Sequence, residues 1–365
     1  MDVVKGGADD GAGVMDIADV REAIAWQAEH SARAGSPHTA RVIRAELAIL
    51  YTDTALGRRM ANWAGLTLRD AMPLRVAAGL HHLLLTGADT RLAPVYQGLL
   101  TRQQAVDEIV TDLARRYDAR LLPWLDRPPQ TNEAGRSASI MAGLLWLSKR
   151  LGPRFEMREI GASAGVNTMM SRYFYDLGGV TAGPSLSRMR IVPEWRGAAP
   201  PDAPVEITAI SGCDSDPLDL AGPAKALRLK AYIWPDALDR MARMDAAIEL
   251  AAVAPPELER ADAAEFVRAM LAQPQEAGVT RVLYHSVMWQ YLPQPTQAAI
   301  TEAMEQAGAA ATTERPLAWL ALETNRATFR HELVVRYWPG GSEPVMLAEA
   351  HPHGAWVESL AGGTG

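Results

Sequence analysis

The sequence predicts an α/β domain with a mainly parallel, doubly wound sheet, preceded by an all-α region. From Ile17 to about Arg150 the apolar residues recur at helical spacing, whereas after Gly152 short apolar runs alternate with helical segments. Such alternation is typical of parallel strands that are covered on both faces. Near the end, HELVVRYW and VMLAEA are separated by PGGSEP, which predicts an antiparallel hairpin closed by a Gly-Gly turn.

The length of 365 residues exceeds what a single core usually needs, and the 48% hydrophobic content is that of a globular protein. We therefore expect an all-α domain over residues 16–151 and an α/β domain over residues 152–360. Residues 1–15 are rich in Gly and Asp and lack an apolar core, so we expect a disordered tail and not a signal peptide or membrane anchor.

The amino-acid composition argues against several kinds of site and partner. The single cysteine, Cys213, excludes an intramolecular disulfide and a Cys-based zinc cluster, and it fits a cytoplasmic location. No segment approaches the roughly 18 to 20 apolar residues that a membrane span needs. A net charge of −7 argues against a broad nucleic-acid surface. The expected partner is a small-molecule substrate, and the number of subunits stays open.

The helical region is interrupted at residues 35–37, 71–73, 86–89 and 126–132, which predicts six to eight helices. His81 and His82 lie together inside an apolar helix, and the HPHG run near the end is too short to form a site alone. We therefore predict no metal site.

Short apolar runs predict the strands of the α/β region: FEMREI, VEITAI, RVLYHSV and LAWLAL, with a further short strand before Asp262. Helices are expected at 236–252 and 263–272. The segment 175–204 is rich in Gly and Pro and contains one strand-like run, MRIV, so we interpret it as an insertion over the sheet edge.

The stretch FEMREIGASAGVNTMM carries the most specific pattern. A strand runs into a turn of small residues, Gly161 to Gly165, and an amphipathic helix is expected to follow. Small residues allow a ligand to approach the backbone closely, and free N–H groups at the start of a helix can hold a carboxylate or phosphate.

The same letters fit two kinds of chemistry. As E-x-G-x-x-x-G they match the loop of S-adenosylmethionine-dependent methyltransferases, in which the turn cradles the methionine part of the cofactor. The residues assigned to this role are Glu159, Gly161, Ala162, Ser163, Gly165 and Asn167. As G-x-S-x-G they match the nucleophile elbow of α/β-hydrolases, with Ser163 as nucleophile.

Chain order favours the first interpretation, because an elbow follows several strands and an oxyanion loop, and the residues before Phe155 have a helical pattern. The hydrolase stays an alternative, because His285, His331, His351 and His353 follow the serine. A dinucleotide-binding G-x-G-x-x-G would need glycine where Ser163 and Val166 stand. A turn that serves only packing is the remaining alternative.

Ligands of doubly wound sheets bind beyond the carboxyl ends of the strands. Asp214 and Asp216 follow the second strand, where an acidic side chain can accept both ribose hydroxyls. The predicted insertion explains their distance from the turn, and a turn or capping role is the alternative. Asp262 follows the third strand, where it can meet an adenine amino group or cap the helix at 263–272.

The fourth strand ends at His285 and Ser286. We assign His285 as a candidate catalytic base and Ser286 to the cofactor, while Trp289 and Tyr291 are candidates for the wall of a substrate site. A histidine whose hydrogen bonds are satisfied within the core is the alternative.

A polar cluster precedes the first strand of the α/β region. Asn132, Glu133 and Arg136 stand at the head of a helix, and we assign them to the substrate, with Arg136 pairing a ligand carboxylate. Helix capping is the alternative.

Several motifs together resemble the bacterial DUF2332 family over roughly residues 22 to 358. They are RAGSPHTA, HHLLLTG, QTNEAGRSA, EIGASAGVN, RYFYDLGG, CDSDPLDL, IWPDALDRMARMDAAIELA and YHSVMWQYLP. That family is uncharacterised, and the resemblance implies a Rossmann-like domain similar to class I methyltransferases behind a helical region. Such methyltransferases typically show an antiparallel pair at the end of the sheet. Val166 stands where the family more often has Leu, a swap of similar volume.

The sequence therefore predicts an S-adenosylmethionine-dependent methyltransferase-like protein that acts on a small molecule. Two alternatives remain: a non-catalytic protein that binds the cofactor, and a serine hydrolase that uses Ser163.

Overall fold

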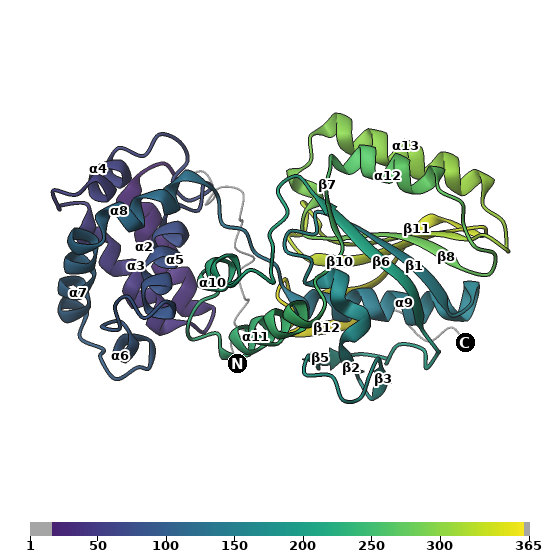
Figure 1. The fold of residues 1–365 in the computed structure, drawn as a ribbon, viewed down its shortest axis with the longest axis horizontal. Coiled ribbons are helices and arrows are strands. Elements are labelled where there is room, and N and C mark those ends of the chain that lie inside the picture. Colours follow the sequence, from purple (N-terminus) through teal and green to yellow (C-terminus); the bar gives the residue numbers. More distant parts are fainter. Residues whose placement is uncertain (1–16, 361–365) are drawn as a thin grey trace, which may run out of the picture. The chain divides into compact units, whose positions relative to one another are not determined.

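The computed structural model describes residues 17–360 and separates into two units (Figure 1). The helical unit comprises the residues up to Thr131 together with Pro223–Ala242. The α/β unit comprises Asn132–Gly222 and the residues from Arg243 onward. The predicted disordered tail, residues 1–15, lies outside the described residues.

Helices are the only regular elements assigned within residues 17–131. They are α2 (Val20–Arg33), α3 (Pro37–Ile49), α4 (Ala55–Ala61), α5 (Met72–Leu85), α6 (Ala93–Tyr96), α7 (Gln103–Arg116), α8 (Asp118–Leu121) and the 3-10 helix η1 (Leu122–Asp126). Their apolar stripes meet in one core that includes Ile24, Ile43, Leu80 and Val110, all fully buried. Burial of these stripes drives the association of the helices.

One helix of the helical unit comes from much later in the chain. α10 (Pro223–Ala231) packs against α5, where His81 Nδ1 lies 3.1 Å from the carbonyl oxygen of Ala231. The division between the units also falls before α9 (Ser137–Leu151), which packs on the sheet through contacts with β9, β10 and β11. The observed division therefore differs from the expected boundary at 151/152, because tertiary partners that are remote in sequence decide where α9 and α10 belong.

The α/β unit is built on a nine-stranded sheet in the order β5-β12-β11-β10-β9-β8-β1-β6-β7. Its strands are β1 (Arg154–Ile160), β5 (Glu194–Arg196), β6 (Glu206–Asp214), β7 (Leu258–Arg260), β8 (Thr280–Ser286), β9 (Leu317–Thr324), β10 (His331–Trp338), β11 (Gly341–Ala350) and β12 (Trp356–Ser359). The neighbouring strands β7, β6, β1, β8 and β9 pair in parallel. β9, β10, β11 and β12 pair antiparallel, each with the next.

The predicted strands and the C-terminal hairpin are confirmed. β8 is buried at every position, as expected for a strand that is covered on both faces. The hairpin forms from β10 and β11, with Tyr337 opposite Gly341 beside the turn.

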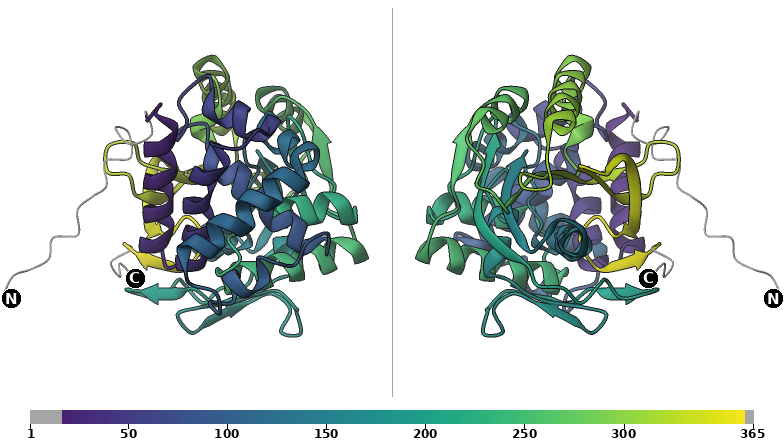
Figure 2. Two further views of the ribbon diagram at one scale, coloured as in Figure 1. Left: turned by 90° about the vertical axis from the view of Figure 1, so that its left-hand side faces the viewer. Right: turned by 90° about the vertical axis from the view of Figure 1, so that its right-hand side faces the viewer.

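Helices cover both faces of this sheet (Figures 1 and 2). α12 (Ala263–Ala272) and α13 (Gln294–Ala310) lie on one face, and α9 lies on the other. α11 (Leu238–Val253) spans the division between the units. Between the sheet and α12 and α13, the buried side chains of Val267, Met270, Leu283, Ile300 and Met304 form one core. The expected helices at 236–252 and 263–272 are present as α11 and α12.

The insertion at 175–204 contains more structure than its sequence indicates. β2 (Phe174–Leu177), β3 (Val180–Ala182) and β4 (Arg190–Ile191) form a separate three-stranded sheet, and β5 joins the edge of the main sheet beside β12. The sequence predicted one strand in this segment, and the structure contains four. Strands of two to four residues are fixed by their pairing partners and leave little local pattern.

The amphipathic helix expected after the glycine turn is also wrong. Only the 3-10 helix η3 (Asn167–Arg172) follows, and the chain then enters β2. Tyr173 and Tyr175 are fully buried. The Tyr173 hydroxyl donates to the Val166 carbonyl, and the Tyr175 hydroxyl donates to the Met170 carbonyl at 3.1 Å. Anchoring of two aromatic rings in the interior competes with continuation of a helix.

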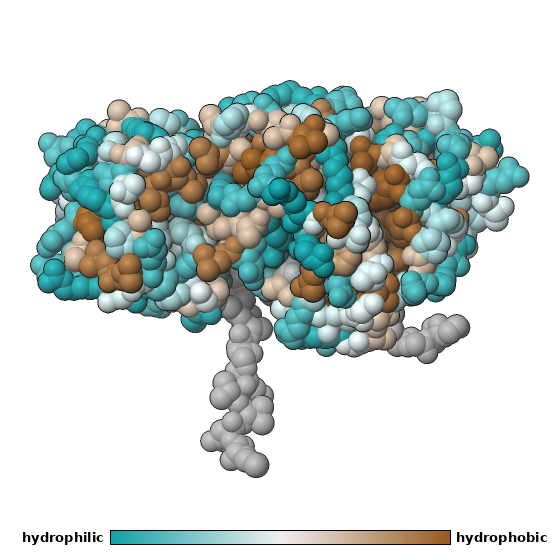
Figure 3. Space-filling view, turned by 60° about the horizontal axis from the view of Figure 1, so that its bottom comes forward, coloured by the Kyte–Doolittle hydropathy of each residue, from teal (hydrophilic) through white to brown (hydrophobic). Residues whose placement is uncertain are grey.

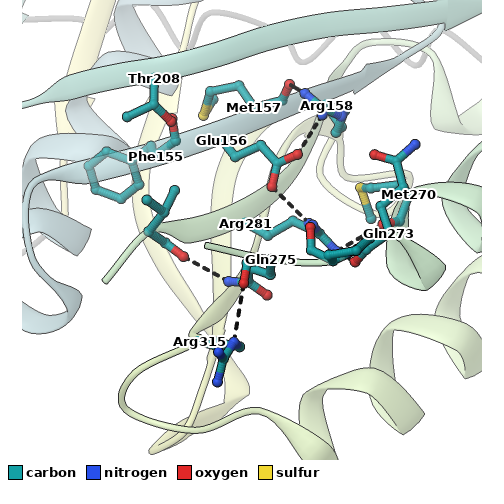
Figure 4. A network of polar contacts seen from close by, with 12 residues as sticks. Phe155, Glu156, Met157, Arg158, Thr208, Met270, Gln273, Gln275, Arg281 and Arg315 are labelled. Atoms are coloured by element: carbon teal, nitrogen blue, oxygen red, sulfur yellow. Dashed lines mark hydrogen bonds and ion pairs between the residues drawn. The ribbon is translucent and has the colours of Figure 1, made fainter. Parts of the chain in front are cut away.

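A buried arginine fastens the end of the sheet at which β1 and β8 begin (Figure 4). Arg281 is 2% exposed and donates to Glu156 Oε2 at 3.0 Å. It also donates to three carbonyl oxygens at the end of α12, those of Met270, Gln273 and Pro274, each at 2.9 Å. The guanidinium thus supplies hydrogen-bond donors to carbonyls at and just beyond the end of the helix.

On the face drawn in Figure 3, hydrophilic residues predominate and hydrophobic residues form separate patches. Among the helices of residues 17–360, none combines the length and the apolar character needed to cross a membrane.

Candidate functional site

The strand order reverses at β1, which has β6 on one side and β8 on the other. At such a switch point the loops beyond the carboxyl ends of the two strands separate and form the usual ligand crevice of an α/β sheet. The loop that leaves β1 is the glycine turn. The carboxyl ends of β1, β6 and β8 are therefore the place to look for a site.

Backbone conformation explains the glycines of the turn. Gly161 and Gly165 have φ of 68° and 72°, and Ser163 also has a positive φ, 54°. A Cβ at Gly161 would lie 2.7 Å from Met288 Cε, and one at Gly165 would lie 2.7 Å from Pro256 Cβ. The close approach that these glycines permit is thus to the chain's own side chains.

Most amides of the turn are already used inside the protein. The N–H of Ser163 donates to Asp214 Oδ2 at 2.9 Å, and the N–H of Val166 donates to Asn132 Oδ1 at 2.8 Å. The N–H groups of Ala162 and Gly165 donate to the carbonyls of Cys213 and Ala162. The free amides expected at a helix start are therefore largely used within the protein. Asp214, at the end of β6, and Asn132, in the segment before α9, accept from two of them.

Asp214 is the acidic residue that the structure brings to the turn. Its second oxygen, Oδ1, accepts from the N–H of Asp216 at 2.9 Å. Asp216 itself points to Arg260, with 2.6 Å between Oδ1 and Nη2, and its side chain is 37% exposed. Of the two aspartates predicted to hold a ribose, Asp214 is the one that accepts from a turn amide, that of Ser163.

Glu159, the last acidic residue of β1, is 2% exposed. Burial raises its pKa to about 8, while the hydrogen bond from Tyr284 and the charge of Arg136 act in the opposite direction. The Tyr284 hydroxyl lies 3.3 Å from Glu159 Oε2 and 3.3 Å from the Asn167 carbonyl. At neutral pH this carboxyl group is therefore mainly protonated and uncharged.

Polar atoms without partners lie next to this acid. Ser163 Oγ and Asn167 Oδ1 are buried and have no hydrogen-bond partner among the described residues. Buried polar groups normally have a partner, which can be a water molecule or a ligand atom. Among the described residues no histidine forms a hydrogen bond with the Ser163 hydroxyl, so the nucleophile–base hydrogen bond of a hydrolase elbow is not formed.

The polar cluster before α9 is used to assemble the unit. Glu133 Oε1 accepts from Arg243 Nε at 3.2 Å. Arg136 donates to the carbonyls of Pro352 at 2.8 Å and Ser286 at 3.3 Å. Arg136 thus joins the end of β8 to the HPHG segment, and these contacts take up donors that were predicted to hold a ligand carboxylate.

His285 is engaged at both ring nitrogens. Nδ1 lies 2.7 Å from Glu323 Oε1, and Nε2 accepts from Trp319 Nε1 at 3.0 Å. The ring is 1% exposed and stacks on Trp289, with 5.0 Å between centroids. With its Nε2 lone pair occupied, this histidine has the geometry of a satisfied core residue, and a base role would require rearrangement.

Two further predicted residues, Asp262 and Tyr291, lie outside the turn. Asp262 Oδ1 caps α12, accepting from the N–H groups of Ala264 at 2.8 Å and Glu265 at 3.2 Å. Tyr291 is 76% exposed. The capping role is therefore present at Asp262, and the cofactor role stays a prediction.

The structure thus places Glu159, Asn167 and Asp214 beside the turn that carries Ser163. Asn132 holds the end of the turn by accepting from the N–H of Val166. Tyr284, Arg243 and Glu323 were not predicted. Glu323 lies at the carboxyl end of β9, as Glu159 does in β1. This position at a strand end was the sequence feature by which Glu323 could have been identified. Tyr284 lies within an apolar run that indicates only core. Across residues 17–360, no three His, Cys, Asp or Glu side chains come together in a way that could hold a metal ion.

A family model described as "Uncharacterized protein conserved in bacteria (DUF2332)" matches residues 21–359. No curated protein and no solved structure matches the chain.

Proposed function

The chain belongs to the DUF2332 family, and we propose that its α/β unit is a methyltransferase-like domain that binds S-adenosylmethionine at the carboxyl ends of β1, β6 and β7. One observation carries the proposal. The glycine turn after β1 and the acidic residue that ends β6 are joined by the hydrogen bond from Ser163 N–H to Asp214. A turn of small residues beside a strand-end carboxylate is the arrangement that holds nucleoside cofactors in doubly wound sheets.

The strand order supports this choice. In chain order, the parallel strands β1, β6, β7, β8 and β9 are arranged third, second, first, fourth and fifth across the sheet, which is the order of doubly wound nucleotide-binding domains. Antiparallel strands then continue the sheet beyond β9. Class I methyltransferases typically show an antiparallel pair at this end of the sheet, whereas dinucleotide-binding domains usually lack one.

The residues divide into roles along the cofactor. The turn from Gly161 to Gly165 takes the methionine part, Asp214 accepts from the ribose hydroxyls, and Asp262 offers its Oδ2 to the adenine amino group. Met288 covers Gly161 in the structure and has to move aside for the ligand, which a flexible thioether side chain can do. Methyl transfer then depends mainly on alignment of acceptor and cofactor.

A second candidate is a protein that binds the cofactor without transferring a methyl group. The contacts of His285 favour it, because Trp319 and Glu323 occupy both ring nitrogens of the base that the sequence predicts. This candidate predicts binding, no formation of S-adenosylhomocysteine, and tolerance of His285→Ala.

Calorimetric titration of the full chain with S-adenosylmethionine and S-adenosylhomocysteine tests the proposal. We expect micromolar binding that falls at least tenfold in Asp214→Asn and is unchanged in Asp216→Asn, whose side chain faces Arg260. Thermal unfolding of both variants serves as the control for folding. Absence of binding by the folded wild-type chain would contradict the proposal.

Two further readouts separate the alternatives. Incubation with S-adenosylmethionine and a small-molecule cell extract should yield S-adenosylhomocysteine if the protein is a transferase, and none if it only binds. A fluorophosphonate probe should leave Ser163 unlabelled, because its hydroxyl lacks a base. Labelling that disappears in Ser163→Ala would favour the hydrolase instead.

A further inference from the structure

A pocket lies in the α/β unit, between α13 and the strands β9 and β10. It is a pocket of about 290 Å³ whose lining includes Trp289, Trp319, Glu323, Val334 and Arg336. None of these residues belongs to the glycine turn or holds it. The size is at the lower end of the range for small-molecule sites.

Two indole rings form the apolar wall. The ring centroids of Trp289 and Trp319 lie 5.5 Å apart, and the rings are inclined by 60°. His285 contacts both rings: Trp289 stacks on it, and Trp319 donates its N–H to His285 Nε2. A wall that is already rigid loses little conformational entropy when a ligand binds.

Glu323 presents one oxygen of a firmly held carboxylate. Its Oε1 accepts from His285 Nδ1 at 2.7 Å and from the N–H groups of Met288 and Trp289 at 3.1 and 3.2 Å. Oε2 has no hydrogen-bond partner within the described chain, and the side chain is 18% exposed. A carboxylate that is fixed through one oxygen and free at the other is suited to accept from a ligand N–H.

Arg336 presents the opposite charge in the same pocket. Its Nη2 lies 3.0 Å from Glu305 Oε1, and its Nε donates to the Ser342 carbonyl at 2.9 Å. Nη1 has no partner in residues 17–360. Glu323 and Arg336 do not pair with each other, although both line this small pocket. The pocket therefore offers a separated acceptor and donor beside an aromatic wall.

We propose that this pocket binds a small zwitterion with an apolar body, of the class of an apolar α-amino acid. The ligand ammonium donates to Glu323 Oε2, the ligand carboxylate accepts from Arg336 Nη1, and the apolar body contacts the indoles. A simple amine would leave Arg336 Nη1 without an acceptor, and a simple acid would bring a second negative charge next to Glu323. The inference goes beyond the cofactor site and holds independently of it.

Titration of the full chain with L-leucine, followed by tryptophan fluorescence and calorimetry, tests this. Two analogues provide matched probes: isoamylamine lacks the carboxylate, and 4-methylpentanoate lacks the amine. We expect L-leucine to bind at least tenfold more tightly than either. No binding of L-leucine overturns the proposal, and equal binding of one analogue also overturns it, because one charge would then suffice.

A variant assigns the binding to the pocket. Glu323→Gln keeps an oxygen for the three internal hydrogen bonds and replaces the free acceptor with an N–H donor, so the affinity for L-leucine should fall at least tenfold. Glu302→Gln, an exposed residue of α13, is the matched control and should bind as the wild type does. Unchanged affinity in Glu323→Gln overturns the assignment. Titration of Glu323→Gln with S-adenosylmethionine separates this result from the cofactor proposal, because that affinity should not change.

Discussion

Glu159 is a carboxylic acid that the fold keeps mainly uncharged at neutral pH. Burial dominates its environment and raises its pKa to about 8. A neutral acid beside the glycine turn does not repel a ligand carboxylate that approaches the same turn, and it can donate a hydrogen bond as well as accept one. The burial of Glu159 is therefore compatible with the proposed binding of the methionine part of the cofactor.

The raised pKa of Glu159 predicts a pH dependence of stability. Between the ordinary glutamate pKa of 4.5 and the folded value of about 8, the native state binds more protons than the unfolded state, so the free energy of unfolding falls as pH rises through this window. Glu159→Gln lacks this titration. Urea unfolding at pH 6 and pH 9 should show the wild type losing about 3 kcal/mol more than the variant. Equal losses in both proteins would contradict the assignment.

Ser163 illustrates a limit of sequence at the scale of single residues. The letters G-A-S-A-G fit a cofactor loop and a nucleophile elbow equally well. The difference is whether a histidine reaches the hydroxyl, and that depends on residues that fold next to it from elsewhere in the chain. The structure leaves Ser163 Oγ without a partner among its described residues.

α12 is the element whose ends are most clearly defined by side chains. Asp262 accepts from two N–H groups at its start. Arg281 donates to the carbonyl of Met270 in the last turn of the helix and to those of Gln273 and Pro274 just beyond it. The first contact follows a sequence pattern for helix starts, whereas the second comes from β8 and leaves no local signal.

The cap at Asp262 predicts a graded response to substitution. Asp262→Ala removes the acceptor and should lower the free energy of unfolding by about 1 kcal/mol, while Asp262→Asn keeps an oxygen acceptor and should stay within a few tenths of the wild type. Urea unfolding of the three proteins measures this. If both variants lost the same amount, capping would not be the main role of the side chain.

Elements were predictable where burial leaves a clear pattern. β1, β6, β8 and β9 and the β10–β11 hairpin follow apolar runs or strong turn signals in the sequence. The helix expected after the turn did not form, because Tyr173 and Tyr175 find buried positions that a local pattern does not reveal. The four strands of the insertion are short enough that pairing partners, which are remote in sequence, determine them.

At the scale of the whole molecule, the chain returns to the helical unit after it has begun the sheet. Asp236 accepts from the N–H groups of His38 and Thr39 at 2.9 and 3.3 Å and from the Thr39 hydroxyl at 2.5 Å. Ser36, at the capping position of α3, makes no side-chain cap of its own. Asp236 therefore supplies the missing cap from a distant segment of the same unit.

This long-range cap predicts the effect of Asp236→Ala. Loss of the carboxylate leaves the first amides of α3 without acceptors and should cost about 1 to 2 kcal/mol of stability. Hydrogen exchange should become faster at His38 and Thr39. Asp202→Ala, an exposed substitution in the α/β unit, is the control and should leave α3 unchanged. Unchanged exchange in Asp236→Ala would show that the contact does not stabilise the helix.

The candidate site could be predicted only in part, because some of its contacts join residues that are remote in sequence. The turn and Asp214 follow predicted strands, and strand ends meet at one edge of a parallel sheet. The occupation of the turn amides by Asn132 and Asp214, and of His285 by Glu323 and Trp319, arises from residues that approach each other only in the folded chain.

Hydrogen exchange of the full chain with and without saturating S-adenosylhomocysteine tests whether the cofactor binds at the glycine turn, because it reports where the ligand binds. We expect slower exchange in the segments 157–168 and 212–218, which carry the turn and Asp214, and no change across α13. Unchanged exchange in both segments, or protection confined to another part of the chain, would contradict binding at the turn.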